Sequence, residues 1–406
     1  MFDVNKIRED FPMLENHPQW VYFDNAATTF KPRSVIQAVM DYYERHTCNI
    51  HRGDYDLSFT MSEEYEKTRQ VVADFIGADS AKEIVFTAGA TSALNAVAYG
   101  YEKSLNENDV ILTTQAEHAS SILPWFRVCE HTKACIEYIP LNECGEITID
   151  NFKKALTDQV KVVVIASVSN VLGHAVSMIE LCRLAHEVGA IVVCDGAQTV
   201  SHMPVNVSAW DVDFFAFSAH KMCAPSGIGV LYGKKALLDK LDVLFYGGGS
   251  NARFDREGCI VLKETPYKFE SGTPAIEGVL GLKAAIHYLD AIGMDVIQQC
   301  EVKLKEYCIQ QMKQLDHVIL YNATALSGIV TFNIEGIFSQ DVASYLNSKK
   351  IAVRSGHHCA KILPTVLKTT DTVRASFYFY NTKEEIDRFI QAVSEITLEN
   401  CINLIL

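Results

Sequence analysis

The sequence has few basic residues and does not concentrate them. Its 406 residues include 36 lysines and arginines against 50 aspartates and glutamates, which gives a formal net charge of −14. A protein that binds nucleic acid through the phosphate backbone needs clustered lysine and arginine side chains. No such cluster is present, so we expect no nucleic-acid partner.

Long apolar runs and paired cysteines are also missing. No window approaches the roughly 18 apolar residues that a membrane-spanning helix needs, so we expect no membrane segment. The 12 cysteines form no CxxC pair and no zinc-finger spacing, so we expect no bound metal. The first residues, MFDVNKIREDF, are polar and charged, which is not typical of a secretory signal. We therefore expect a cytoplasmic protein with reduced thiols.

The chain has ample material for a core. Hydrophobic residues make up 49% of its 406 residues, a length beyond the size at which one core usually stops growing, so two domains are predicted. In residues 21–290, runs rich in valine and isoleucine alternate with amphipathic helices, which is typical of a mostly parallel α/β sheet covered on both faces. The predicted strands are 83–87, 109–114, 160–168, 190–195, 213–218 and 227–233, and the helices include 32–46, 63–77 and 179–189.

The pattern changes after about residue 290. The predicted elements there are a strand at 327–334, a helix at 339–350, strands at 351–355 and 373–380, and a final helix from Thr382. We assign residues 1–20 and 291–406 to a smaller α+β domain. The glycine-rich, charged stretch 246–258 is expected to be an exposed loop.

The segment DFFAFSAHKMCAPSGIGVLYG (213–233) places Lys221 between two apolar strands. Lysine is rarely buried without a partner. One interpretation is a solvated lysine on a turn. The other is a Schiff-base lysine whose amine is activated by loss of water, with Ser218 and His220 facing an anion such as a cofactor phosphate.

Asp195 ends the apolar run AIVVCD (190–195). In open α/β sheets, ligands bind beyond the carboxyl ends of the strands. A carboxylate there can keep a pyridinium nitrogen protonated, as pyridoxal phosphate requires. The alternative is an ordinary helix N-cap, a common position for aspartate after a strand. With Lys221 further along the chain, the cofactor interpretation is favoured.

Two weaker signals follow other strands. The stretch FTAGATSALNAVA (86–98) combines a strand, a glycine turn, Thr91-Ser92 and a helix. Such a helix N-terminus suits a phosphate, although threonine and serine are also ordinary N-caps. His118 follows the strand at 109–114, where an imidazole can stack on a flat ring, although a lone histidine is more often structural.

Cys359 lies in IAVRSGHHCA (351–360), a polar turn without an apolar pattern around the thiol. Cysteine is usually a small buried hydrophobe, so a packing residue is one interpretation. The other is a nucleophile, whose thiolate is favoured by neighbours that are cationic or donate hydrogen bonds. Arg354, His357 and His358 are the candidates for that effect.

Taken together, these motifs resemble those of one family. FSAHKMCAPSGIGVLYG looks like the lysine segment of fold-type I, class V pyridoxal-phosphate enzymes. RSGHHCA is similar to the group II (SufS-type) cysteine desulfurases, which also act as selenocysteine lyases. The resemblance implies a large domain with a mostly parallel seven-stranded sheet and a smaller C-terminal domain. It covers nearly the whole chain through VYFDNAATTFKP (21–32), HRGDYDLS (51–58), SNVLG (169–173), FESGTP (269–274) and VRASFYFYNTKEEIDR (373–388).

The resemblance also implies a role for each candidate residue. Lys221 would bind pyridoxal 5'-phosphate, and Cys359 would be the nucleophile. The other implied roles are Asp195 at the ring nitrogen, Gln198 at the ring hydroxyl, His118 stacked on the ring, Asn170 beside cofactor and substrate, Thr91, Ser218 and His220 at the phosphate, Thr273 at the phosphate of the other subunit of a homodimer, Arg374 at the substrate carboxylate, and Arg354 and His51 in the same pocket.

The implied reaction converts L-cysteine to L-alanine and leaves a persulfide on Cys359. A sulfur-acceptor protein of the SufE or SufU kind would collect the sulfur for iron–sulfur cluster assembly. Selenocysteine lyase and cysteine-sulfinate desulfinase would use the same pocket, and both stay open. An aminotransferase or racemase, and an inactive protein of the same fold, are the more distant alternatives. The chain departs from the family pattern at Ala90, Ser92, Gln340 and the flank Lys361–Pro364.

Overall fold

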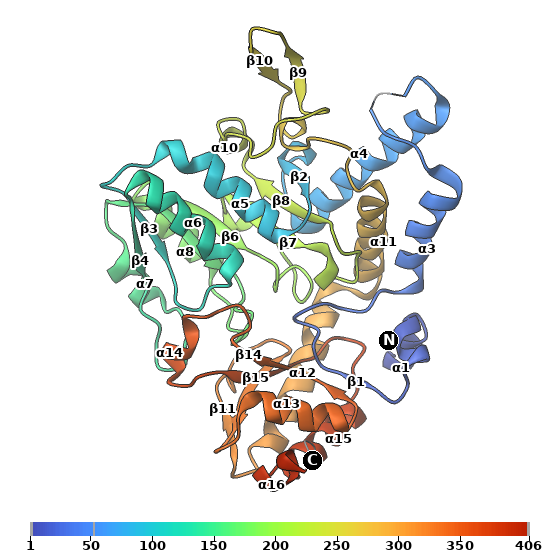
Figure 1. Cartoon of the computed structure of the whole chain (residues 1–406), viewed down its shortest axis with the longest axis vertical. Helices are drawn as coiled ribbons and strands as arrows, with labels where there is room; N and C mark the ends of the chain where they lie inside the picture. The colour runs from blue at the N-terminus through green and yellow to red at the C-terminus, as the bar shows by residue number, and fades with distance from the viewer. Residues whose placement is uncertain (1–2, 52, 404–406) are drawn as a thin grey trace.

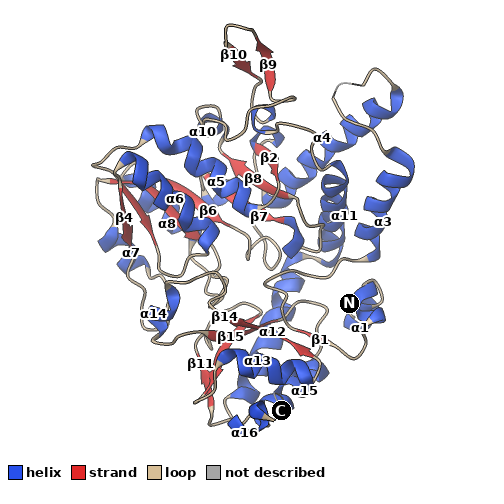
Figure 2. Cartoon of the chain, viewed as in Figure 1, coloured by secondary structure: helices blue, strands red, loops and turns tan. Residues whose placement is uncertain are grey.

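A computed structural model describes residues 3–51 and 53–403. Residues 1–2 and 404–406, at the ends of the predicted smaller domain, lie outside the described residues, as does residue 52. Two sheets with their covering helices organise the described residues (Figures 1 and 2). The strands are β1 (Val21–Tyr22), β2 (Ile84–Thr87), β3 (Val110–Thr113), β4 (Cys135–Tyr138), β5 (Val160–Ala166), β6 (Ile191–Asp195), β7 (Phe214–Ser218), β8 (Gly229–Gly233), β9 (Asn251–Phe254), β10 (Ile260–Leu262), β11 (Val318–Leu320), β12 (Ile329–Ile334), β13 (Ile351–Ala352), β14 (Arg354–Gly356) and β15 (Thr372–Ser376).

Helices surround both sheets, and within the described residues none is long and apolar enough to cross a membrane. They are α1 (Val4–Arg8), α2 (Pro12–Asn16), α3 (Arg33–Asp41), α4 (Asp56–Ile76), α5 (Ala90–Tyr101), α6 (Ala119–Thr132), α7 (Ile149–Ala155), α8 (Met178–Glu187), α9 (Val207–Trp210), α10 (Lys235–Leu238), α11 (Ile276–Ile292), α12 (Met294–Met312), α13 (Ser339–Ser348), α14 (Leu363–Leu367), α15 (Lys383–Ser394) and α16 (Leu398–Ile402).

The larger sheet has seven strands in the order β2-β8-β7-β6-β5-β3-β4. Strands β3, β4, β5, β6 and β7 run parallel, and β8 is antiparallel to its neighbours β2 and β7. This arrangement confirms the predicted α/β class and the mostly parallel sheet. Its central strands are buried because helices cover both faces. Val162 and Val164 of β5 share a core cluster with side chains of α5 and α6, whereas Val163 and Ile165 share one with side chains of α8.

The parallel strands bring chemistry-bearing residues to one edge of the sheet. Asp195 is the last residue of β6 and pairs with Ala166 of β5 and Ala216 of β7. Ser218 is the last residue of β7, and the turn Ala219–Lys221 follows it directly. The carboxyl edge of the sheet therefore carries Asp195, Ser218 and Lys221 on adjacent strands.

The smaller sheet has the antiparallel order β11-β12-β15-β14, and α12, α13 and α15 pack with it. The predicted strand at 351–355 is divided, because β13 pairs with β1 near the start of the chain whereas β14 pairs with β15. Val21 and Phe23 accordingly pack in the core of this second sheet. The chain thus reaches the smaller sheet at both of its ends.

One local prediction was wrong, and another was right in its extent but not in the type of its last helical turn. The stretch 246–258 is not loop throughout, because β9 pairs with β10 in a hairpin that projects from the body in Figure 1. The partner strand lies beyond the predicted loop, so composition alone did not reveal it. The helix predicted at 32–46 ends at Asp41, and a five-residue π-helical turn, Tyr42–His46, completes it.

Candidate active site

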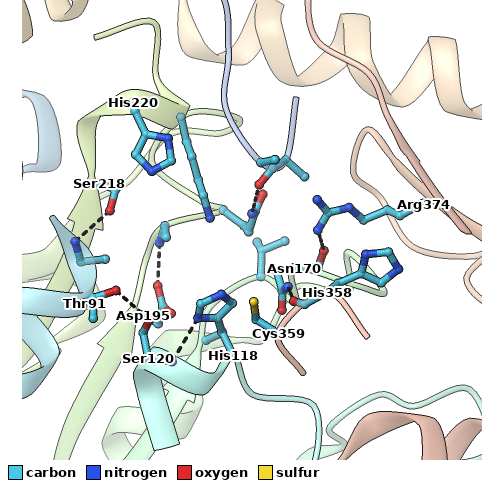
Figure 3. Close-up of a pocket in the computed structure, with 18 of the residues that line it drawn as sticks. Thr91, His118, Ser120, Asn170, Asp195, Ser218, His220, His358, Cys359 and Arg374 are labelled. Atoms are coloured by element: carbon cyan, nitrogen blue, oxygen red, sulfur yellow. Dashed lines mark hydrogen bonds between the residues drawn. The ribbon is translucent and has the colours of Figure 1, made fainter. Parts of the chain in front are cut away.

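A cavity of about 250 Å³ brings residues of both sheets together (Figure 3). The strand ends of the larger sheet and the turns after them contribute Asp195, Ser218 and Lys221, and β14 and β15 contribute Arg354 and Arg374. The sequence-predicted residues that line it are Thr91, His118, Asn170, Asp195, Gln198, Ser218, His220, Lys221, Arg354, Cys359 and Arg374.

Lys221 is the central amine of the cavity. Burial lowers the pKa of this amine to about 8, against the attraction of Asp195, and the charges of Arg374 and Arg354 lower it further. About a tenth of the amine is then unprotonated at pH 7, far more than for an ordinary lysine. That state is the one needed for attack on an aldehyde or for proton transfer.

Asp195 is held by two donors and is only 6% exposed. Its Oδ1 accepts a hydrogen bond from the Ala197 amide at 2.9 Å, and its Oδ2 accepts one from the Ser121 hydroxyl at 2.8 Å. Asp195 therefore fits both of its interpretations. Its carboxylate caps the following turn, and it also lines the cavity where a cofactor would bind. Ser121 was not singled out from the sequence, although it lies only three positions after His118.

His118 is the residue before α6, and its ring lines the cavity. Its Nδ1 accepts a hydrogen bond from the Ser120 amide at 3.1 Å, and burial lowers its pKa, so the neutral ring carries its proton on Nε2. The preceding Glu117, which sequence reasoning missed, accepts hydrogen bonds from Thr114 Oγ1 at 2.7 Å and from the Ala166 amide at 2.8 Å. These contacts tie the His118 segment to β5.

The N-terminus of α5 closes another side of the cavity. The Ala90 amide donates to Ser218 Oγ at 2.8 Å, and Thr91 Oγ1 lies 2.7 Å from Ser120 Oγ. β8 runs against this loop so closely that a Cβ at Gly229 would lie 2.4 Å from Gly89 Cα. Amide and hydroxyl donors at the start of a helix suit a phosphate. Ser92 lines a different pocket, so Thr91 is the hydroxyl of this pair that lines the cavity.

Two arginines share one carboxylate at the opposite side. Arg354 donates through Nε and Nη2 to Asp24 at 3.1 and 2.9 Å, and Arg374 Nη2 lies 3.4 Å from the same side chain. Arg374 also donates to the Asn170 carbonyl at 2.6 Å. Burial lowers the pKa of Arg374 to about 10, so it stays cationic at neutral pH, and its buried Nε finds no hydrogen-bond partner among the described residues. Asp24 was missed, although it begins the DNAATT segment.

The Cys359 loop has an unusual backbone. His358 and Cys359 both have positive φ angles, 50° and 60°, a region that non-glycine residues rarely adopt. Three contacts hold them there. The Ala119 amide donates to the Cys359 carbonyl at 2.8 Å, Asn170 Nδ2 donates to the His358 carbonyl at 2.8 Å, and His358 Nε2 donates to the Thr372 carbonyl at 3.1 Å. The loop therefore presents an exposed thiol on a fixed backbone.

His358 is not a cationic neighbour of the thiol, which was one of the two roles that the sequence left open for it. Burial, followed by the charge of Arg374, lowers its pKa to about 3, so the ring is neutral at pH 7 and hydrogen bonds to Thr372. Arg354 lines the cavity as a cation, whereas His357 is exposed.

We expect this buried histidine to make the folded protein sensitive to acid. As the pH falls below 6.5, His358 becomes protonated in the unfolded chain, whereas in the folded chain it stays neutral down to about pH 3. The free energy of unfolding therefore falls as the pH falls, by about 2 kcal/mol from this residue at pH 5. His358→Gln should lose less stability than wild type between pH 7 and pH 5 in urea titrations. The exposed His17→Gln is the control, and parallel curves for wild type and His358→Gln would contradict the assignment.

Two predicted residues lie elsewhere in the single chain. His51 and Thr273 line a second pocket of about 170 Å³, together with Tyr267 and Glu270. The implied position of His51 beside Arg374 is therefore not found within one chain. Thr273, which the resemblance assigns to the phosphate of the other subunit, lines this second pocket as well.

The cavity fits pyridoxal phosphate. Within the part of the chain that the structure describes, the buried Oε1 of Gln198 has no hydrogen-bond partner, while its Nε2 donates to the Ala26 carbonyl at 2.8 Å. Gln198 Oε1 is therefore free to accept a hydrogen bond from a ring hydroxyl. The helix N-terminus suits the phosphate, and Asp195 and Lys221 line the same cavity. Fold and site together define a fold-type I enzyme that uses pyridoxal 5'-phosphate.

Comparison with known proteins agrees with this class. Residues 21–389 match the family described as Aminotransferase class-V, and the chain belongs to that family. It is 44% identical to a probable cysteine desulfurase of Halalkalibacterium halodurans over 97% of this chain and 98% of the relative. A probable cysteine desulfurase of Staphylococcus aureus is 39% identical, with 97% of each chain covered.

Solved structures extend the likeness to the fold. The apo cysteine desulfurase of Thermococcus onnurineus NA1 superposes with a TM-score of 0.93 at 38% identity, covering 97% of this chain and 98% of the other. The cysteine desulfurase CsdA of Escherichia coli gives a TM-score of 0.91 at 32% identity, covering 100% of this chain and 99% of the other.

Proposed function

We propose that the protein is a cysteine desulfurase that converts L-cysteine to L-alanine and retains the sulfur as a persulfide on Cys359. The observation that carries the proposal is the composition of one cavity. It joins the activated amine of Lys221 and the carboxylate of Asp195 to the cation of Arg374 and an exposed thiol. An aminotransferase needs the first three groups but has no use for the thiol.

Pyridoxal phosphate, when bound, supplies the electron-withdrawing ring that makes the Cα proton of an amino acid acidic. Lys221 would hold the cofactor and then carry that proton once its amine is free. Asp195 would keep the ring nitrogen protonated, and Gln198 would accept from the ring hydroxyl. The remaining cofactor contacts would come from His118 on the ring face, Asn170 beside it, and Thr91, Ser218 and His220 at the phosphate.

The transfer of sulfur to Cys359 needs no added oxidant or reductant. The Cys359 thiolate attacks the substrate sulfur, a sulfur–sulfur bond forms, and the bond between that sulfur and the substrate Cβ breaks. The electron pair of the broken bond stays on carbon, which takes up a proton and leaves as L-alanine. Arg374, with an unpartnered buried Nε, would hold the substrate carboxylate, and Arg354 would line the same side.

We further propose a cytoplasmic homodimer in which His51 and Thr273 complete the cavity of the other subunit. Their position together in a second pocket supports this arrangement. Within each chain, residues 21–290 would form the cofactor-binding domain, and residues 1–20 with 291–406 the domain that carries Cys359. The exposed thiol would pass its sulfur to an acceptor protein of the SufE or SufU kind for iron–sulfur cluster assembly.

The decisive experiment gives the purified protein pyridoxal phosphate and L-cysteine. We expect a visible absorbance band, one alanine per sulfur released, and a mass gain of one sulfur on Cys359. Alanine without persulfide would favour an aminotransferase-like reaction, and absence of the band would exclude every pyridoxal-phosphate activity. Parallel turnover of selenocysteine and cysteine sulfinate ranks the alternatives that use the same pocket.

We expect Arg374→Lys to weaken substrate binding. Lysine keeps the charge but loses the planar fork that pairs with a carboxylate through two bonds. Loss of one charge-assisted hydrogen bond predicts a rise in KM of about 10- to 100-fold with a smaller fall in kcat. Steady-state kinetics on L-cysteine measure both, with the exposed Arg127→Lys as control. An unchanged KM would remove Arg374 from substrate binding.

A further inference from the structure

The carbonyl oxygen of His220, the residue before Lys221, lies within a cluster of donors from one short segment. Thr28 Oγ1 donates to it at 3.0 Å, Lys31 Nζ at 3.0 Å and the Thr29 amide at 3.1 Å. Thr29 Oγ1 lies 3.3 Å from the same oxygen. A carbonyl oxygen has two lone pairs, so this acceptor is fully used.

Lys31 is unusual in its own right. Its ammonium contacts His220 O, Thr29 O and Thr28 Oγ1, and within the described residues it forms no ion pair with a carboxylate. Burial lowers its pKa to about 8. An ammonium has three donors, and all three are directed at neutral oxygens. The Lys31 side chain is half-buried and loses part of its hydration without a carboxylate partner among the described residues, so this arrangement calls for an explanation beyond packing.

Residues 28–31 also bind the backbone that follows Lys221. Thr29 Oγ1 accepts a hydrogen bond from the Cys223 amide at 2.8 Å, so the residues on both sides of Lys221 are bound to residues 28–31. The segment is itself anchored, because Tyr22 of β1 donates to the Thr28 carbonyl at 2.9 Å and stacks on Phe30. β1 in turn pairs with β13.

We propose that Lys31, with Thr28 and Thr29, forms a positioning unit that fixes the His220–Lys221 peptide and so the direction from which the Lys221 side chain enters the cavity. The inference rests on the proposed function. That function gives Lys221 two tasks, and both need its amine at the same position in the cavity. The amine would hold the cofactor and, once free, would move a proton at the substrate Cα. A side chain of four methylenes does this reproducibly only when its backbone root does not move.

The chain offers a matched control in Lys268. Its Nζ also donates to two backbone carbonyls, Asp239 O at 3.0 Å and Leu241 O at 2.9 Å, and burial lowers its pKa as well. Lys268 does not line the cavity. Replacing either lysine by methionine removes comparable carbonyl contacts, but only Lys31→Met disturbs the root of Lys221.

The test uses the holoenzyme and two readouts, a spectrophotometric pH titration of the cofactor band and steady-state kinetics on L-cysteine. For Lys31→Met we expect a titration midpoint shifted by about one pH unit and a kcat reduced about 10- to 100-fold, the order expected when a reacting group is misplaced. KM should stay within about threefold, and Lys31→Arg should recover most of the loss. Thr28→Val, which removes one donor and no charge, should shift both readouts in the same direction by less.

Each outcome has a defined meaning. A wild-type titration and kcat in Lys31→Met and Thr28→Val overturn the inference while leaving the proposed function intact. Equal changes in Lys268→Met also overturn it, because they show a general loss of stability. If Lys31→Met fails to fold, Thr28→Val decides alone. If wild type never develops the cofactor band, the proposed function fails, and the inference fails with it.

Discussion

Replacing Cys359 by alanine is expected to reduce sulfur release from L-cysteine by about 10³-fold or more, the scale of losing a nucleophile. The thiol is the group placed to accept the substrate sulfur, since it is exposed and lines the same cavity as Lys221 and Arg374. The cofactor band should stay unchanged, because Cys359 is not among the residues proposed to hold the cofactor. Turnover measured as sulfide and as alanine, with mass measurement of Cys359, checks the result.

The control for this variant is Cys144→Ala, which removes an exposed cysteine that does not line the cavity. It should retain wild-type turnover. If Cys359→Ala still released sulfur from cysteine at the wild-type rate, the persulfide mechanism would be wrong. Survival of selenocysteine turnover in Cys359→Ala would show that the thiol is needed for sulfur alone.

Replacing Lys221 by alanine is expected to reduce the turnover rate by about 10³-fold or more, within the range for loss of a positioned acid–base group. The amine is the one in the cavity whose pKa falls to about 8, so it can both bind an aldehyde carbon and move a proton near neutral pH. The band of the protein-bound cofactor should be lost even with excess pyridoxal phosphate. Absorbance and alanine production are measured on the same sample.

Lys240→Ala is the control for Lys221→Ala, because Lys240 is exposed and does not line the cavity. It should retain the band and the rate. Retention of the wild-type band in Lys221→Ala would show that another lysine holds the cofactor.

Much of the fold follows from local pattern. The runs that became β5, β6 and β7 are apolar except for Lys161, Asp195 and Ser218, because both faces are covered, and their ends were predicted to within two residues. The pairing of β1 with β13 was not predicted, because a two-residue strand carries no periodicity and its partner lies at the other end of the chain. The hairpin of β9 and β10 was missed for a related reason, since three of the four residues in β9 are exposed.

The site divides in the same way. Lys221, Asp195 and Cys359 stand out because each has a residue type that its local sequence does not explain. Asp24, Ser121 and Glu117 did not, because their importance lies in what they touch across the sheet. The sequence also could not distinguish a charged histidine from a buried neutral one, so it left open a cationic role for His358 that burial prevents.

The placement of Asp24 also bears on how the protein is made. Asp24 binds Arg354 from 330 residues away, and β1 pairs with β13 across a similar separation. Contacts this distant in sequence form only after the intervening chain has been synthesised. A nascent chain that stops before β13 contains Lys221 and the segment that binds the His220 carbonyl, but β1 has no partner strand, and Arg354, Arg374 and the Cys359 thiol have not been synthesised. The cavity that joins the Lys221 amine to the Cys359 thiol can therefore form only after synthesis has passed residue 359.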